Sequence, residues 1–163
     1  MDHPVSLAAF EGGDAPVVAS WIRSDDEADQ WASVRLQAVT PQLFAAWHAD
    51  HEVRPFVARD DGRACGYGEV WVDADEHDAE LARIVVDPQR RGRGVGRRLA
   101  ELLAAEAMRL GFADVWLRVV PTNTAAIACY TAAGFVRASA EVEQAFNQPQ
   151  PRPYVWMRFE GAA

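Results

Sequence analysis

The stretch VDPQRRGRGVGRRLAELL, residues 86–103, constrains the fold of this chain more than any other. A β-branched run leads into it, and it contains five arginines and three glycines before it turns leucine-rich. From Arg93 to Leu110 the apolar residues recur at helical spacing, and a glycine then ends the pattern. The next apolar run, residues 113–120, has the length and composition of a buried strand. We therefore expect a strand–helix–strand crossover at the centre of the fold.

The rest of the chain predicts a mixed α/β fold. Asp61 and Gly62 lie between two β-rich runs within residues 54–73, which is a strong signal for an antiparallel hairpin. Asp14, Ser24 and Thr40 have the positions of N-caps ahead of three short helices. The other predicted strands cover residues 5–10, 79–87, 134–142 and 154–159, and the predicted helices outside the crossover cover residues 15–22, 24–33, 41–50 and 123–133.

The overall composition is that of one folded domain spanning residues 1–163, with 50% apolar and 25% charged residues. No apolar run approaches the roughly 20 residues that a membrane-spanning helix needs, and no secretory signal pattern is visible, so a cytoplasmic protein with no membrane partner is expected. Cys65 and Cys129 lack metal-ligand spacing and are expected to be reduced core residues. His48 and His51 are interpreted as surface histidines, because no third ligand is near, and no metal site is expected.

The basic residues restrict what the glycine-rich turn can bind. The formal net charge is -8, and all sixteen basic residues are arginines, five of which cluster in residues 90–98. A negative surface with one positive spot suits a small anionic ligand better than a nucleic acid. A phosphate-binding P-loop is excluded because it needs a lysine. A dinucleotide fingerprint fits poorly, since the spacing here is G-x-G-x-G and the preceding strands are predicted to be antiparallel.

A third anion-binding pattern fits better. The pattern R-x-x-G-x-G is matched by Arg91, Gly94 and Gly96, and residues 89–94 match its Q form. Downstream, LRVVPTNTAAIACYTAAGFV contains the pattern N-x-x-A-I-x-x-Y-x-x-x-G-F. Together, in this order over residues 79–136, the two stretches resemble signatures of the GNAT-type N-acetyltransferase superfamily. The resemblance implies an α/β fold with a central, mostly antiparallel sheet of about seven strands, a V-shaped split between strands four and five, and about four to five flanking helices.

The resemblance also implies acetyl-CoA as co-substrate, bound without a metal. The first N–H groups of a helix lack partners and attract phosphate, glycines let the backbone approach closely, and arginines add charge-assisted hydrogen bonds. By resemblance, main-chain groups of the preceding strand bond the pantetheine arm. The expected cofactor-binding residues are Ile84, Val85, Val86, Arg91, Gly92, Arg93, Gly94, Val95, Gly96, Arg97 and Asn123. Asn123 fits an N-cap equally well.

Two residues are candidates for proton transfer. Glu80 lies where many family members carry a glutamate that deprotonates the amine, usually through water. Glu69, Asp73 and water alone remain alternatives, because strand alternation could aim either carboxylate at the same cleft. Tyr130 lies where family members often place a tyrosine that protonates the leaving thiolate; the alternative role is that of a core aromatic residue.

The predicted function is transfer of an acetyl group from acetyl-CoA to a primary amine of a small molecule or a peptide. Trp21, Trp31, Trp71 and Trp156 and the loop FNQPQPRPY are candidates for the wall of the acceptor site, and the sequence leaves a homodimer open. The alternative function is a non-catalytic acyl-CoA-binding or regulatory module on the same fold. No nucleic-acid partner is expected.

Overall fold

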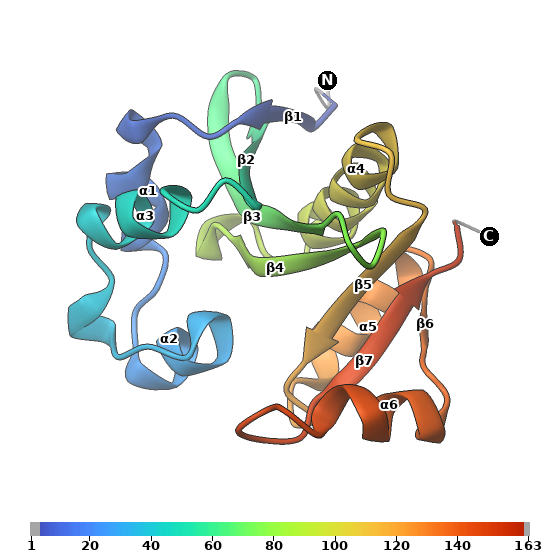
Figure 1. The fold of residues 1–163 in the computed structure, drawn as a ribbon. Helices are drawn as coiled ribbons and strands as arrows, with labels where there is room; N and C mark the ends of the chain where they lie inside the picture. The colour runs from blue at the N-terminus through green and yellow to red at the C-terminus, as the bar shows by residue number, and fades with distance from the viewer. Residues whose placement is uncertain (1–3, 162–163) are drawn as a thin grey trace.

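The structure, a computed structural model, describes residues 4–161 and is built on one seven-stranded sheet (Figure 1). Its strands lie in the order β1-β2-β3-β4-β5-β7-β6. In the described residues, β4 and β5 form the one parallel pair, and all other neighbours are antiparallel. The strands are β1 (Ser6–Ala9), β2 (Val53–Asp60), β3 (Arg63–Asp73), β4 (Asp78–Val86), β5 (Asp114–Val119), β6 (Phe135–Arg137) and β7 (Val155–Phe159).

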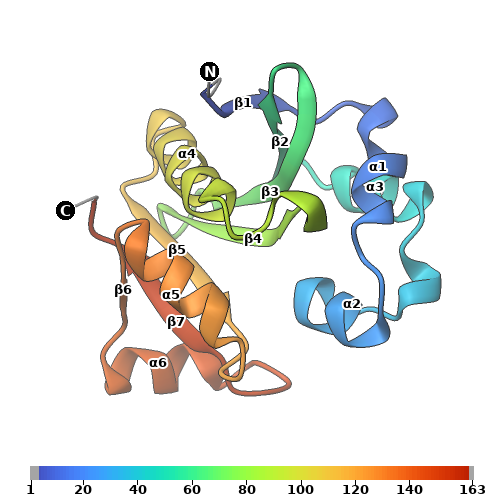
Figure 2. The ribbon, with the colours of Figure 1, turned by 180° about the vertical axis from the view of Figure 1, so that it is seen from behind.

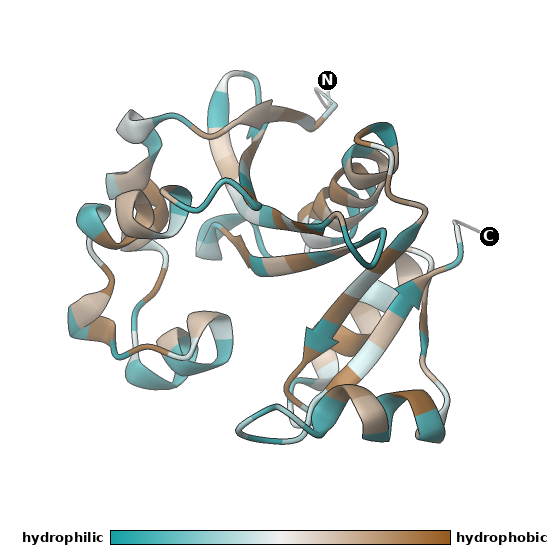
Figure 3. Ribbon diagram, in the orientation of Figure 1, coloured by the Kyte–Doolittle hydropathy of each residue, from teal (hydrophilic) through white to brown (hydrophobic). Residues whose placement is uncertain are grey.

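Helices cover both faces of the sheet (Figures 1 and 2). The longest, α4, connects β4 to β5 and shares one hydrophobic core with α5, while α1 and α3 enclose a second core on the opposite face with Val57, Tyr67 and Val85. Hydrophobic residues gather on the strands and on the sheet-facing sides of helices, whereas the β3–β4 turn and the loop after α6 are hydrophilic (Figure 3). The helices are α1 (Ala15–Ser20), α2 (Asp25–Ala32), α3 (Pro41–His48), α4 (Val95–Arg109), α5 (Thr124–Ala132) and α6 (Ala140–Asn147).

The sheet splits between β4 and β5. Their ladder runs only from the pair Asp78–Asp114 to the pair Leu81–Leu117, although β4 continues to Val86. Because β5 turns to antiparallel pairing with β7, the second half of β4 has no strand on its β5 side within this sheet. The predicted crossover and the predicted split between strands four and five are therefore confirmed.

Local chemistry explains most of the element boundaries. Asp61 and Gly62 both have positive φ values (50° and 77°), as a two-residue hairpin turn requires. The Ser24 hydroxyl accepts from the Glu27 N–H at 3.1 Å and begins α2. Asp14 does precede α1, but its carboxylate does not cap that helix: it accepts from the Glu11 N–H at 2.9 Å and pairs with Arg59 at 2.8 Å.

One predicted element was wrong. Residues 134–142 were expected to form a strand, but β6 covers only Phe135–Arg137 and α6 begins at Ala140. The Ser139 hydroxyl accepts from the Val142 N–H at 3.3 Å, and alanine, glutamate and glutamine then favour a helix. This helix raises the number of α-helices in the described residues above the four to five expected. None of the helices within residues 4–161 is both long and apolar enough to cross a membrane.

Candidate active site

A cavity of about 1060 Å³ lies at the split in the sheet. It reaches through the sheet, because its wall includes residues of α2 and β3 from one face and of α4 and α5 from the other. Its ionisable lining residues include two glutamates and four arginines, so the negative surplus of the chain does not extend into it. These residues are Glu27, Glu80, Arg83, Arg91, Arg97 and Arg118.

The glycine-rich turn forms one end of the cavity. Gly92 and Gly94 have φ values of 75° and 82°, which favour glycine over any residue with a Cβ. The first hydrogen bond of α4 runs from the Arg98 N–H to the Gly94 carbonyl oxygen at 3.0 Å, so the N–H groups of residues 95–97 precede the helical ladder. These N–H groups and the helix dipole make this end of the cavity favourable for an anion.

Close packing places the end of β4 beside this turn. A Cβ built on Gly96 would lie 3.2 Å from the Cys129 Sγ and 3.6 Å from the Val86 Cγ2, so glycine lets α4 approach both β4 and α5. Ile84, Val85 and Val86 line the cavity where β4 has left β5. Their main-chain groups are therefore placed at the wall of the cavity, at an edge that could accept an extended ligand.

Glu80 lies at the start of the split and is held by an arginine. The Arg118 Nε–H donates to its Oε1 at 2.6 Å, and the Arg118 Nη1–H donates to the Gln150 Oε1 at 2.6 Å. The Arg118 guanidinium also lies 5.3 Å from the Tyr154 ring centre. Burial raises the pKa of Glu80 above its ordinary value, and Arg118 partly opposes that shift.

Tyr130 faces the cavity from α5, on the other side of the split. Its ring packs on Phe135 with the ring centres 6.3 Å apart. Burial raises the pKa of the Tyr130 phenol, which keeps its hydroxyl protonated and makes it a weaker acid than an exposed tyrosine, although it carries the proton that a general acid must supply. Tyr130 thus combines the packing role and the cavity-facing position that the sequence left as alternatives.

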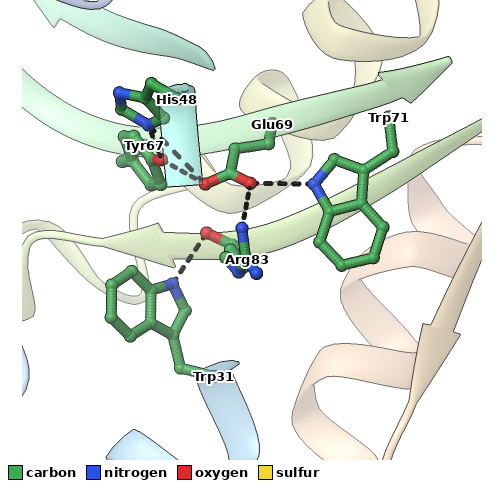
Figure 4. Close-up of polar contacts among 6 residues, drawn as sticks. All are labelled: Trp31, His48, Tyr67, Glu69, Trp71 and Arg83. Atoms are coloured by element: carbon green, nitrogen blue, oxygen red, sulfur yellow. Dashed lines mark hydrogen bonds and ion pairs between the residues drawn. The ribbon is translucent and has the colours of Figure 1, made fainter. Parts of the chain in front are cut away.

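The two alternative carboxylates lie elsewhere. Glu69 is fully buried and does not line the cavity. It accepts hydrogen bonds from the Tyr67 hydroxyl, from Trp71 Nε1 at 2.8 Å and from Arg83 Nη1 at 2.7 Å (Figure 4). Asp73 is exposed at the end of β3, where its carboxylate accepts from the Asp75 N–H of the following turn at 3.0 Å. Of the three carboxylates, Glu80 alone is at the cavity.

His48 is not the surface histidine that was expected. Its side chain is only 16% exposed, and its Nε2 lies 2.9 Å from the Tyr67 hydroxyl and 3.9 Å from the Glu69 carboxylate. Burial lowers the pKa of His48. Among the described residues, no group of three or more histidine, cysteine, aspartate or glutamate side chains could hold a metal ion.

The cavity brings most of the predicted cofactor-binding residues together. Arg93 is exposed and Val95 is buried in the core, and neither lines the cavity. Asn123 lines the cavity and also caps α5, because its Oδ1 accepts from the Ala126 N–H at 3.2 Å. The predicted residues that line it are Ile84, Val85, Val86, Arg91, Gly92, Gly94, Gly96, Arg97 and Asn123.

The opposite wall contains residues that the sequence reasoning named only in part. Trp31 and Trp71 line the cavity, as do Gln150, Pro151 and Tyr154 of the proline-rich loop region, whereas Trp21 and Trp156 are buried and lie outside its lining. Two further lining residues, Arg83 and Arg118, were missed. The available signal was a charged residue inside each of two runs otherwise predicted as buried strands.

Known proteins resemble this chain in sequence and fold. A family model described as the acetyltransferase (GNAT) family matches residues 18–135. The chain is 38% identical over 84 residues to the [Ribosomal protein bS18]-alanine N-acetyltransferase of Escherichia coli (strain K12). This alignment covers 52% of this chain and 55% of that protein. The chain is 30% identical over 135 residues to a mycothiol acetyltransferase of Geodermatophilus obscurus. This alignment covers 78% of this chain and 38% of that protein.

The match thus spans about half or less of these curated relatives. Among solved structures, the aminoglycoside acetyltransferase AAC(6')-Ib in complex with coenzyme A and kanamycin superposes with a TM-score of 0.74 at 21% identity, over 95% of this chain and 94% of that one. At that identity the likeness concerns the fold. By the family match over most of its length, the chain belongs to the acetyltransferase (GNAT) family.

Proposed function

We propose that this protein is an N-acetyltransferase that moves an acetyl group from acetyl-CoA to a primary amine of a small molecule or a peptide. One observation carries the proposal: the split in the sheet opens a single cavity that has the start of α4 at one end and Glu80 and Tyr130 in its wall. The relatives support an amine acceptor, since one is named for acetylating an alanine of a ribosomal protein and one structure contains an aminoglycoside acetyltransferase with kanamycin.

The residues present fit acetyl-CoA. Its diphosphate would be held by the N–H groups at the start of α4. Arg91 and Arg97 flank this turn and both line the cavity, so their side chains would add contacts to the phosphates. The pantetheine arm would lie along Ile84–Val86, where β4 pairs with β3 on one side and has no strand on its β5 side. Bound in this way, acetyl-CoA supplies an activated acyl group on a thioester.

Glu80 would remove the proton of the amine. An aliphatic ammonium has a pKa near 10, so an acceptor needs a base before its nitrogen can attack a carbonyl carbon. A raised pKa lies closer to neutral pH and makes the Glu80 carboxylate a better base than that of an ordinary glutamate. Arg118 keeps the carboxylate in one orientation while leaving it in the cavity wall.

Tyr130 would protonate the leaving sulfur. It lies on α5, across the split from Glu80, so one residue can take a proton from the acceptor while the other gives a proton to the donor side. A main-chain N–H of Ile84–Val86 would polarise the carbonyl oxygen under attack. The proton of the amine and the proton of the thiol are thus handled by different groups.

Substitution of the glycine turn tests the function. We expect Gly94→Glu to abolish coenzyme A binding in isothermal titration and thiol release from acetyl-CoA with an amine panel, because it places a side chain and a negative charge at the start of α4. The matched control is Gly62→Glu in the β2–β3 turn: its φ of 77° resembles the 82° of Gly94, and a Cβ at either position has nothing within 4 Å.

The control separates backbone strain from loss of the site. Both variants should lose similar stability in thermal unfolding, since both place a non-glycine residue at positive φ. Equal coenzyme A binding by the two variants would refute the assignment of the turn. Binding of coenzyme A by the wild-type protein without thiol release from any amine tested would instead favour a non-catalytic acyl-CoA-binding module.

A further inference from the structure

A β-bulge lies in β4 where the cavity begins. Tyr67 pairs with Val85 and Glu69 with Ala82, so the single residue Gly68 of β3 is opposite two residues of β4, Arg83 and Ile84. Arg83 has a φ of 50°. A non-glycine residue in the left-handed region costs about 1–2 kcal/mol, so contacts must hold this conformation in place. The bulge begins two residues after Leu81, which forms the last β4–β5 pair.

Three aromatic residues and one carboxylate hold Arg83 at both its ends. Its main-chain carbonyl oxygen accepts from Trp31 Nε1 at 2.7 Å, which ties the bulge to α2 (Figure 4). Its guanidinium lies 3.8 Å from the Trp47 ring centre and 4.8 Å from the Trp71 ring centre. The guanidinium Nη1 of Arg83 donates to the Glu69 Oε1 at 2.7 Å. A cation between two indole rings with a carboxylate at its edge has few other orientations.

Glu69 is itself fixed. It is 0% exposed, its Oε1 also accepts from Trp71 Nε1, and its Oε2 accepts from the Tyr67 hydroxyl, which in turn contacts His48 (Figure 4). A carboxylate in such a position is costly to bury and is retained only with well-placed partners. The carboxylate therefore acts as a rigid support for the Arg83 side chain.

The bulge is also supported from the opposite face. A Cβ on Gly68 would lie 2.5 Å from the Leu103 Cδ1 and 3.3 Å from the Ile84 Cγ1, so α4 presses on β3 where β3 faces the bulge. Since side chains alternate along a strand, Tyr67 and Glu69 lie on one face and α4 packs on the other. The position of Ile84–Val86 is thus set by α4 from one side and by Glu69 and Arg83 from the other.

We propose that Glu69 is a positioning residue for the acyl donor: through Arg83 it holds the β4 bulge, and thereby holds the main chain of residues 84–86 where the pantetheine arm binds. This inference rests on the proposed function, because it takes the pantetheine arm as the ligand of that main chain. It gives Glu69 a role distinct from the base role that the sequence left open for it.

The test compares two ligands that share their phosphates. On the proposed function, coenzyme A would contact both the α4 turn and the bulge, whereas adenosine 3′-phosphate 5′-diphosphate, which lacks the pantetheine arm, would contact the turn alone. For Glu69→Gln we expect the dissociation constant of coenzyme A to rise about tenfold, because a charged hydrogen bond to Arg83 is lost. The dissociation constant of the nucleotide should not change. Glu106→Gln, which breaks an exposed pair with Arg109 on α4, should change neither constant.

Each outcome decides the proposal. A selective loss of coenzyme A affinity supports it, while equal losses for both ligands, or no loss for either, overturn it. Trp31→Phe, which removes the N–H bonded to the Arg83 carbonyl oxygen, should give a smaller loss with the same selectivity and serves if Glu69→Gln does not fold. If the wild-type protein binds neither ligand, the proposed function fails as well; if it binds both and Glu69→Gln shows no selective loss, only the present proposal fails.

Discussion

Two parts of the molecule contain the same types of side chain in very different surroundings. The Glu69 cluster consists of Glu69, Arg83 and Tyr67, and the cavity wall offers Glu80, Arg118 and Tyr130. Each has a glutamate paired with an arginine, and in each burial raises the pKa of the tyrosine. The glutamates lie on neighbouring strands, β3 and β4.

Access to the cavity separates the two glutamates. The Glu69 side chain is 0% exposed and has hydrogen-bond donors on both oxygens, whereas Glu80 is 20% exposed and lines the cavity. A carboxylate whose two oxygens are both occupied by donors of the fold has no free acceptor site for a ligand, so it serves the structure. A carboxylate with one arginine partner and an open side remains available to a ligand. The surroundings of these glutamates, more than their residue type, therefore decide their role.

The largest expected difference between the groups is in stability. Glu69→Ala should lower the free energy of unfolding by about 3–5 kcal/mol, because it removes the fully buried partner of the Arg83 charge, whose side chain is only 17% exposed. Glu80→Ala should lower it by less than about 1 kcal/mol, since the Glu80–Arg118 pair is partly exposed to solvent. Urea unfolding measures both values. Similar losses for the two variants would show that the Glu69 cluster is not the more rigid region.

The next effect is on turnover and belongs to Glu80. Glu80→Gln should lower kcat by about 10²-fold with little change in coenzyme A affinity, because it removes the proposed base and leaves the α4 turn intact. Steady-state kinetics with the best acceptor, together with titration of coenzyme A, measures the two quantities. A variant with wild-type kcat would remove Glu80 from the base role and leave water as the route for the proton.

The pH dependence of the Glu80 effect has a definite sign. Burial raises its folded pKa above the ordinary 4.5, so the folded protein binds this proton more tightly than the unfolded chain does. Stability from this group is therefore present below the unfolded pKa and is lost as the pH rises through the folded pKa. Turnover rises over the same window, because the carboxylate is the active form, and Glu80→Gln should lack this limb of the pH–rate profile.

The smallest effect is expected for the tyrosine of the cavity wall. Tyr130→Phe should lower kcat by about tenfold, less than Glu80→Gln, because a thiol has a pKa of about 8.5 and its thiolate leaves with modest assistance. Its cost in stability should be small.

Tyr67→Phe should instead lower the free energy of unfolding by about 1–3 kcal/mol, since it removes a buried donor to Glu69. A larger stability loss for Tyr130→Phe than for Tyr67→Phe in urea unfolding would contradict the comparison.

Much of the fold could be predicted because its signals are local. The turn at Asp61 and Gly62 and the glycines before α4 require backbone conformations that few residues adopt, so the sequence shows where they occur. Residues 134–142 gave no such signal: three strand residues run directly into a helix, and the β-branched residues outweighed Ser139 and the helix-forming residues after it. Element type there depends on pairing with β7.

The candidate site was predictable along single segments and not between them. The turn from Arg91 to Arg97 is one continuous motif, and all of its residues except Arg93 and Val95 line the cavity. The roles of Arg83, Arg118 and His48 depend on partners that are 52, 38 and 19 residues away in the chain, namely Trp31, Glu80 and Tyr67. Hydrophobic periodicity does not report such distant contacts.

The short ladder between β4 and β5 divides the sheet into two plates, β1 to β4 and β5 to β6, that are joined at a narrow waist. Its four residue pairs, Asp78–Leu81 against Asp114–Leu117, are the whole main-chain connection between the plates in the described residues. An extended ligand lodged beyond the waist would act as a temporary strand and make the plates continuous. On the proposed function, the sheet is then complete only while the acyl donor is bound, and each turnover ends by dividing it again.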